Sequence, residues 1–182
     1  AADQLARMIR ECGTKLQTGF VGTPYLLHVL SDYGHTDLAY SLLLREQYPS
    51  WLYPVTKGAT TVWEHWDGIM ENGDFWSRNM NSFNHYAYGA VADWVYCCAA
   101  GITPAEGYPG YSKVRITPAP DARLDWLEGS LDTRHGRIIS RWKKQDSLWR
   151  YEITTPVDAE VVIDGKTFLV GAGSYIYHSS IQ

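Results

Sequence analysis

The period of the apolar residues changes along the chain, and this change limits the possible folds more than any other feature of the sequence. Over about the first hundred residues, apolar side chains recur every three or four positions, which places them on one face of a helix. From residue 112 they alternate with polar side chains, as in a sheet with one buried face. The sequence therefore predicts a helical part, residues 1–111, followed by a small antiparallel β-domain, residues 112–182.

Four longer helices are expected in the first part. The first covers residues 1–16, and because the sequence opens inside it we expect a piece of a longer protein. Thr23 and Thr36 are expected to cap the second and third helices. The last helix covers residues 82–100 and ends at Gly101. One face of the first helix is formed by Leu5, Met8, Ile9, Cys12 and Leu16.

The second part is expected to begin after a linker. Residues 102–120 are rich in Pro and Gly, which favours an irregular connection rather than a helix. Further on, Asp164-Gly165 separates two short apolar runs and predicts a tight hairpin turn between strands. Such a turn is typical of an antiparallel β-domain.

Charge and motifs exclude several functions. The net charge is −4, and Lys and Arg do not cluster, so neither a nucleic acid nor an anionic membrane surface is an expected partner. The sequence contains no CxxC, no HExxH and no glycine-rich phosphate loop. We therefore expect no metal and no nucleotide cofactor, and we expect the adjacent Cys97 and Cys98 to be small buried thiols.

The segment between the third and last helices is the strongest candidate for a functional site. In Ala59-Thr-Thr-Val-Trp-Glu-His-Trp-Asp-Gly68, Glu64 lies between Trp63 and Trp66. Tryptophan offers a flat apolar face and a polar edge, which suits the C–H faces and hydroxyls of sugars. A structural role for Glu64 is equally compatible with the sequence, because Thr61-x-x-Glu64 also fits the capping box of a helix N-terminus. The two explanations are compatible, since a helix N-terminus keeps a carboxylate ionised.

Hydrolysis of a glycosidic bond requires two carboxyl groups, one as acid and one as base or nucleophile. Glu64 fits one half of that pair. Asp67 and Asp74, in the same segment, are candidates for the other half, but they are more typical of acids in loops and turns. The second carboxyl group is therefore not assigned from these residues alone.

Four motifs give the chain a specific resemblance. They are Thr18-Gly-Phe-Val-Gly-Thr-Pro-Tyr25, Tyr48-Pro-Ser-Trp-Leu-Tyr-Pro54, the Trp-Glu segment at 59–68 and Met80-Asn-Ser-Phe-Asn-His-Tyr-Ala-Tyr-Gly89. In this order they resemble the bacterial α-L-rhamnosidases of glycoside hydrolase family 78, over residues 18–111. The resemblance implies the C-terminal part of an (α/α)6 helical barrel followed by a β-sandwich.

The resemblance also implies roles for individual residues. Glu64 corresponds to the family's general base in an inverting mechanism, and His85 to a histidine that contacts the bound rhamnose. Trp63 and Trp66 are expected to contribute to substrate binding. The family's general acid lies in earlier barrel helices, and nothing here matches that stretch. The expected partners are therefore a rhamnose-containing glycoside or polysaccharide and the remainder of the barrel.

Three other functions remain open at this point. A non-catalytic carbohydrate-binding module would explain the eight Trp and thirteen Tyr but not the helical part. A structural fragment would leave an exposed apolar face and would self-associate. A different barrel enzyme, such as a polysaccharide lyase, would need positive charge near its base, and residues 50–85 contain only Lys57 and Arg78.

Overall fold

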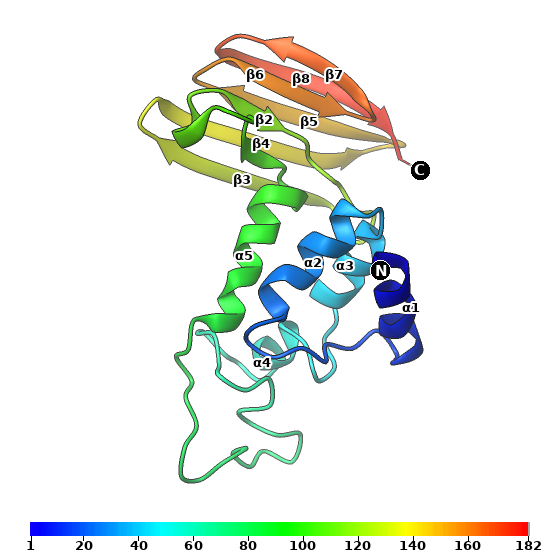
Figure 1. Cartoon of the computed structure of the whole chain (residues 1–182), viewed down its shortest axis with the longest axis vertical. Helices are drawn as coiled ribbons and strands as arrows, with labels where there is room; N and C mark the ends of the chain where they lie inside the picture. Colours follow the sequence, from blue (N-terminus) through cyan, green and yellow to red (C-terminus); the bar gives the residue numbers. More distant parts are fainter. Residues whose placement is uncertain (182) are drawn as a thin grey trace. The chain divides into compact units, whose positions relative to one another are not determined.

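Short helices bury the apolar residues of an N-terminal unit, Ala1–Ala92, in a computed structural model that describes residues 1–181 (Figure 1). Their bounds are Ala2–Glu11 for α1, Thr23–Asp32 for α2, Thr36–Leu43 for α3 and Leu52–Thr56 for α4. Helices α2 and α3 pack closely against each other. The apolar helix side chains that are at most 3% exposed are Ala6, Leu27, Leu30, Leu38, Ala39, Tyr40 and Leu42.

The helix ends differ from those predicted. Thr23 and Thr36 are the first residues of α2 and α3 rather than their caps. The Thr23 hydroxyl donates instead to the carbonyl oxygen of Thr18 at 3.0 Å, which anchors the preceding loop. Helix α1 ends at Glu11, and Leu16 is buried outside the helix. Cys12 is exposed, and Cys97 and Cys98, which were expected to be buried, are only half-buried.

The last helical stretch begins later than predicted and is irregular. Residues 82–86 are not helical, and the stretch consists of a 3-10 turn at Ala87–Ala90, α5 at Val91–Trp94 and a π-turn at Val95–Ala99. Gly101 ends it with φ +74°, as its position predicted.

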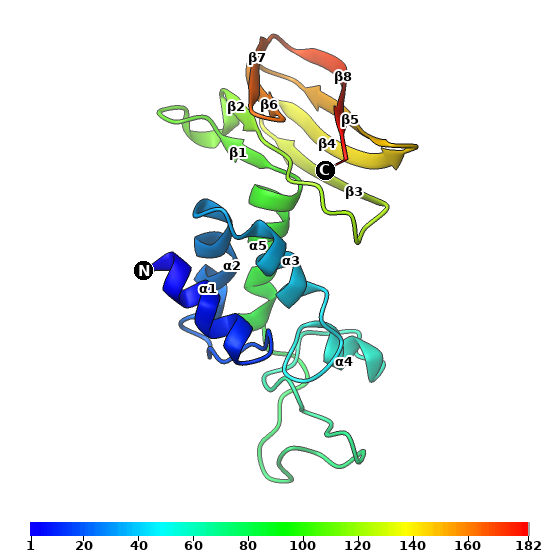
Figure 2. The same cartoon turned by 90° about the vertical axis from the view of Figure 1, so that its right-hand side faces the viewer.

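From Asp93 onward the chain forms a second unit that contains two four-stranded sheets (Figure 2). One sheet has the order β1-β2-β6-β7, with bounds Ile102–Pro104, Val114–Ile116, Ala159–Ile163 and Lys166–Val170. The other has the order β3-β4-β5-β8, with bounds Trp126–Thr133, Gly136–Gln145, Leu148–Thr155 and Gly173–Ser180. All neighbours are antiparallel except β2 and β6, which run parallel.

The expected linker is wrong in part. Residues 102–120 contain β1, a 3-10 turn at Pro109–Tyr111 and β2, and the two strands pair in register from Ile102↔Ile116 to Pro104↔Val114. The predicted hairpin turn at Asp164-Gly165 is confirmed, with φ +49° and +72° between β6 and β7. The β-domain thus begins its pairing directly after the helical stretch.

The inner faces of the two sheets form one apolar core. Trp142 at its centre is fully buried, and its indole N–H donates to the carbonyl oxygen of Ala99 at 2.8 Å. Ser140 donates to the carbonyl oxygen of Ala100 at 2.6 Å. These two bonds satisfy carbonyl groups that a helix end leaves without intrahelical partners. The same core contains Ile102, Val114, Ile116, Ile138, Trp149, Tyr151, Ile153, Val161 and Ile163.

Within residues 1–181, no helix has the length and apolar character needed to cross a bilayer. The same part of the chain holds no group of three or more His, Cys, Asp or Glu side chains placed to bind a metal ion.

Candidate active site

Two segments that are distant in sequence run side by side at the candidate site. The backbone N–H of Glu64 donates to the carbonyl oxygen of Ser82 at 3.0 Å, and that of His85 donates to Val62 at 2.8 Å. The hydroxyl of Thr61 donates to the carbonyl oxygen of Phe83. The predicted capping box is therefore wrong: residues 57–86 contain no helix, and Thr61 and Glu64 bond to the opposite segment instead.

A small hairpin separates the two segments along the chain. Ile69 and Phe75 pair as an antiparallel bridge, and Met70 donates to the carbonyl oxygen of Asp74 at 2.8 Å. The Asp74 carboxylate accepts from the side-chain amide of Asn72 at 2.9 Å. Asp74 thus holds the turn of this hairpin, a structural role in agreement with the sequence pattern.

Aromatic rings from the two paired segments and from Trp51 pack against one another. Trp63 is only 5% exposed, and its ring contacts Phe83 edge-on at 5.0 Å. Trp66 is half-buried and stacks on Tyr88 with ring centroids 3.7 Å apart. Trp51 contacts Trp66 edge-on at 5.4 Å and donates its indole N–H to the carbonyl oxygen of Tyr88 at 2.9 Å. Together these indoles and Tyr88 line a cavity of about 100 Å³.

The ring of His85 is held between two contacts. It stacks on Phe20 with centroids 4.9 Å apart and an interplanar angle of 12°. Its Nδ1 accepts from the backbone N–H of Ala87 at 3.4 Å, a long contact that favours the tautomer with the proton on Nε2. A neutral imidazole in this tautomer offers one N–H donor, which suits a hydroxyl oxygen.

The four sequence motifs converge through these contacts. Phe20, from the first motif, contacts both His85 and Tyr88 of the fourth. Trp51, from the second, contacts Trp66 of the third and Tyr88 of the fourth. Phe20, Trp51 and Tyr88 lie inside the four motifs, but the sequence alone does not mark them as site residues, because apolar rings have no spacing that separates a site from a core.

Asp67 lies near enough to two tyrosines for its charge to act on both. Burial raises the pKa of Tyr48, and the charge of Asp67 raises it further. Burial also raises the pKa of Tyr53, with further contributions from Glu71 and Asp67. The Tyr53 hydroxyl donates to the carbonyl oxygen of Ile69 at 3.0 Å, so these groups brace the hairpin.

The chain is similar to known proteins over most of its length. Residues 1–99 match the family model described as the bacterial alpha-L-rhamnosidase 6 hairpin glycosidase domain, and residues 101–170 match the bacterial alpha-L-rhamnosidase C-terminal domain. An alpha-L-rhamnosidase of Streptomyces avermitilis is 48% identical over 145 residues, which is 80% of this chain and 14% of that protein. One from Formosa agariphila is 40% identical over 167 residues, 92% of this chain and 18% of that protein.

Solved structures give the same result. The crystal structure of the S. avermitilis alpha-L-rhamnosidase complexed with L-rhamnose matches with a TM-score of 0.90 and 39% identity, over 98% of this chain and 19% of that one. The crystal structure of the native α-L-rhamnosidase from Aspergillus terreus matches with a TM-score of 0.92 and 35% identity, over 97% of this chain and 21% of that one. The chain thus spans less than a quarter of the length of the relatives it matches.

These matches place the helical unit in the class of six-hairpin glycosidases and the strands in the C-terminal domain that accompanies it. The predicted fold, the end of an (α/α)6 barrel followed by a β-sandwich, is confirmed. Within that class, the chain belongs to the bacterial α-L-rhamnosidase family.

Proposed function

We propose that this chain is the part of an α-L-rhamnosidase that supplies the general base, Glu64, for removal of terminal α-L-rhamnose from glycosides or polysaccharides with inversion. The observation that supports this most directly is the paired backbone of the two motifs. Glu64 is bonded to Ser82 and His85 to Val62, so a carboxylate and an imidazole are presented from adjacent segments.

In an inverting reaction the two carboxyl groups lie about 6.5–9.5 Å apart, leaving room for a water molecule on one face of the sugar. Ionised Glu64 accepts a proton from that water as its oxygen forms a bond to the anomeric carbon. The glycosidic C–O bond breaks, and the leaving oxygen takes its proton from the general acid. The product is β-L-rhamnose. The acid belongs to the remainder of the barrel.

The neighbouring side chains position the sugar and the base. The Nε2–H of His85 donates to a rhamnose hydroxyl, with the ring oriented by Phe20. Trp66, half-buried beside Glu64, offers an apolar face to the C–H groups of the substrate. Trp63 is buried, so its contribution to binding is to fix the Glu64 segment against Phe83.

The test is Glu64→Gln in a full-length rhamnosidase that carries this chain. The amide keeps the shape but cannot accept the proton, so turnover should fall by about 10²–10⁴ with a small change in substrate affinity. The melting temperature should stay near that of the parent, because the backbone bond to Ser82 is unaffected. Asp132→Asn is the matched control, since Asp132 is an exposed carboxylate paired with Arg137 in the β-domain. Near-parent turnover by Glu64→Gln would exclude Glu64 as the base.

A further inference from the structure

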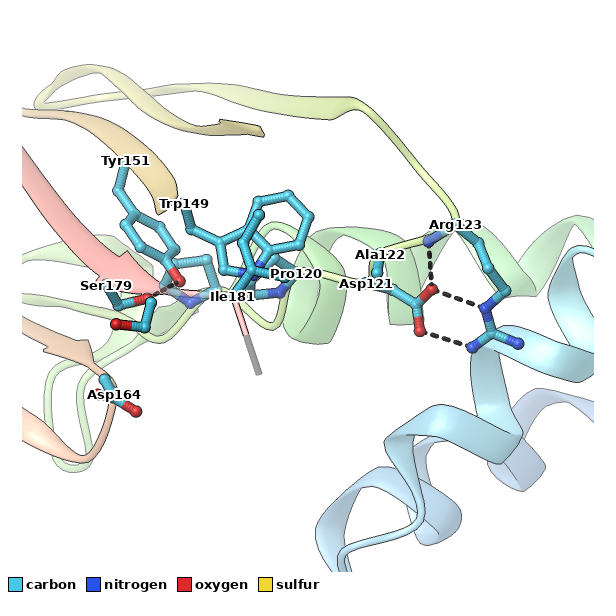
Figure 3. A pocket seen from close by; sticks show the side chains of 11 residues that line it. Pro120, Asp121, Ala122, Arg123, Trp149, Tyr151, Asp164, Ser179 and Ile181 are labelled. Carbon is cyan, nitrogen blue, oxygen red and sulfur yellow. Dashed lines mark hydrogen bonds and ion pairs between the residues drawn. The ribbon is translucent and has the colours of Figure 1, made fainter. Parts of the chain in front are cut away.

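A cavity of about 520 Å³ opens in the β-domain, between the 118–123 segment and strands β5 and β8 (Figure 3). Its volume falls in the range of about 300–1,000 Å³ that is typical of small-molecule sites. Asp164, Ser179 and Tyr151 lie at one end, and Asp121 with Arg123 at the other. No residue of the candidate active site lines it.

The wall that carries Asp121 is held rigidly. The carboxylate accepts from Arg123 Nε at 2.6 Å and Nη2 at 2.5 Å, and from the backbone N–H of Arg123 at 2.9 Å. Lys144 on β4 donates from Nζ to the carbonyl oxygen of Ala122 at 2.5 Å, which fixes the turn to the sheet. A ligand that contacts this wall would lose little to ordering of the protein.

The opposite end presents hydroxyl and carboxylate groups. The Tyr151 hydroxyl and the Ser179 hydroxyl are hydrogen-bonded at 3.0 Å, and each keeps further capacity for a ligand. Burial raises the pKa of the Tyr151 phenol, the hydrogen bond with Ser179 lowers it in part, and the charge of Asp164 at the exposed β6–β7 turn raises it further. Pro120, Ile181 and the edge of Trp149 supply apolar surface between the two ends.

These groups define the chemistry of a ligand. The charge of Asp121 is compensated by Arg123, whereas Asp164 leaves the cavity with a negative charge that disfavours anions. A ligand with several hydroxyl donors and apolar C–H faces would satisfy both the oxygen acceptors and the apolar strip. We infer that this cavity binds a neutral saccharide unit, as a second carbohydrate contact separate from the one proposed around Glu64.

The direct test is an NMR titration of the ¹⁵N-labelled chain with L-rhamnose and D-galactose, with D-galacturonate as the anionic probe. The indole N–H of Trp149 should shift saturably with a neutral sugar, with a Kd on the order of 1–10 mM, as expected for so small a ligand. Galacturonate should bind at least about threefold more weakly, because Asp164 repels it. Shifts confined to the indoles of Trp63 and Trp66, or no saturable shift with either neutral sugar, would overturn the inference. The first of these results would leave the proposed function intact.

Two variants separate the cavity from the general surface. Ala122→Trp places a ring at the exposed turn that lines the cavity and should weaken binding at least about tenfold. Ala172→Trp is the matched control, because Ala172 is also exposed but does not line the cavity, and it should bind as the parent does. Asp164→Asn tolerates the φ of +49° and should both weaken neutral-sugar binding and remove the discrimination against galacturonate. Unchanged binding in both Ala122→Trp and Asp164→Asn would place the sugar elsewhere.

Discussion

The backbone N–H of His85 donates to the carbonyl oxygen of Val62 at 2.8 Å, two residues before Glu64. The bond from Glu64 to Ser82 lies on the same pair of segments, so main-chain atoms set the distance between the two motifs. Side-chain changes at either position should therefore alter chemistry at one point without moving the other.

His85→Ala, in a full-length rhamnosidase that carries this chain, should raise KM by about five- to tenfold and leave kcat within about threefold. The reason is that one neutral hydrogen bond to a sugar hydroxyl is worth about 1 kcal/mol and acts on substrate and transition state alike. Steady-state kinetics on an aryl α-L-rhamnoside measure both constants. His135→Ala, on an exposed hairpin of the β-domain, should change neither. A fall in kcat with unchanged KM would assign His85 a role in the chemical step instead.

The 182-residue chain by itself should hydrolyse an aryl α-L-rhamnoside at least about 10² times more slowly than a full-length relative. It offers the proposed base, but the proposed acid belongs to other helices of the barrel. The comparison requires equal molar amounts and a check of folding by circular dichroism. Turnover close to that of the relative would show that both carboxyl groups are present in this segment.

Gly101→Ala should destabilise the β-domain by about 3 kcal/mol or more in chemical denaturation. Its φ is +74°, and an added Cβ would lie 2.1 Å from the carbonyl carbon of Thr117. Gly107→Ala is the matched control: its φ is +78°, but no atom lies within 4 Å of the added Cβ, so only the backbone strain of about 1 kcal/mol remains. Equal losses in the two variants would contradict the importance of the close approach at Thr117.

The Asp121–Arg123 ion pair should stabilise the folded state only at a pH at which Asp121 is ionised. The guanidinium of Arg123 lowers the pKa of Asp121 below the ordinary value of 3.8. The ionised form is thus favoured in the folded state, and its contribution is present above about pH 4 and is lost as the pH falls through the lowered pKa. Asp121→Asn should therefore melt below the parent at pH 6, with the difference shrinking toward pH 2–3. A difference independent of pH would mean that the amide perturbs packing rather than charge.

The β-domain was largely predictable because its signals are local. Alternation places Trp149, Tyr151 and Ile153 on one face of β5, and the Asp164-Gly165 turn needs the positive φ that these two residues tolerate. Strand β1 was missed because it is only three residues long and lies among prolines, so its pairing with β2 leaves no periodic pattern.

The candidate site was predictable only through its motifs. Local spacing suggested a capping box at Thr61 and Glu64, but long-range bonds to Ser82 and Phe83 prevail, and the Thr61 bond joins residues 22 positions apart. No single-sequence periodicity reports such a pairing. For the same reason the predicted helix at 82–100 begins only at Ala87, because residues 82–85 serve as the partner segment.

The parallel pairing of β2 with β6 has a consequence for how the domain is made. Val114 pairs with Ala159 and Ile116 with Val161, so the hairpin of β1 and β2 leaves the ribosome long before its neighbour in the sheet. Until Ala159–Ile163 has been synthesised, one edge of β2 presents unpaired N–H and C=O groups to any other strand in the cell. Contacts between such distant residues also slow folding. Because the edge of β2 stays open without β6, a chain truncated before β6 should associate with other chains through this edge. Synthesis of β6, late in the domain, should therefore remove the open edge that β2 presents.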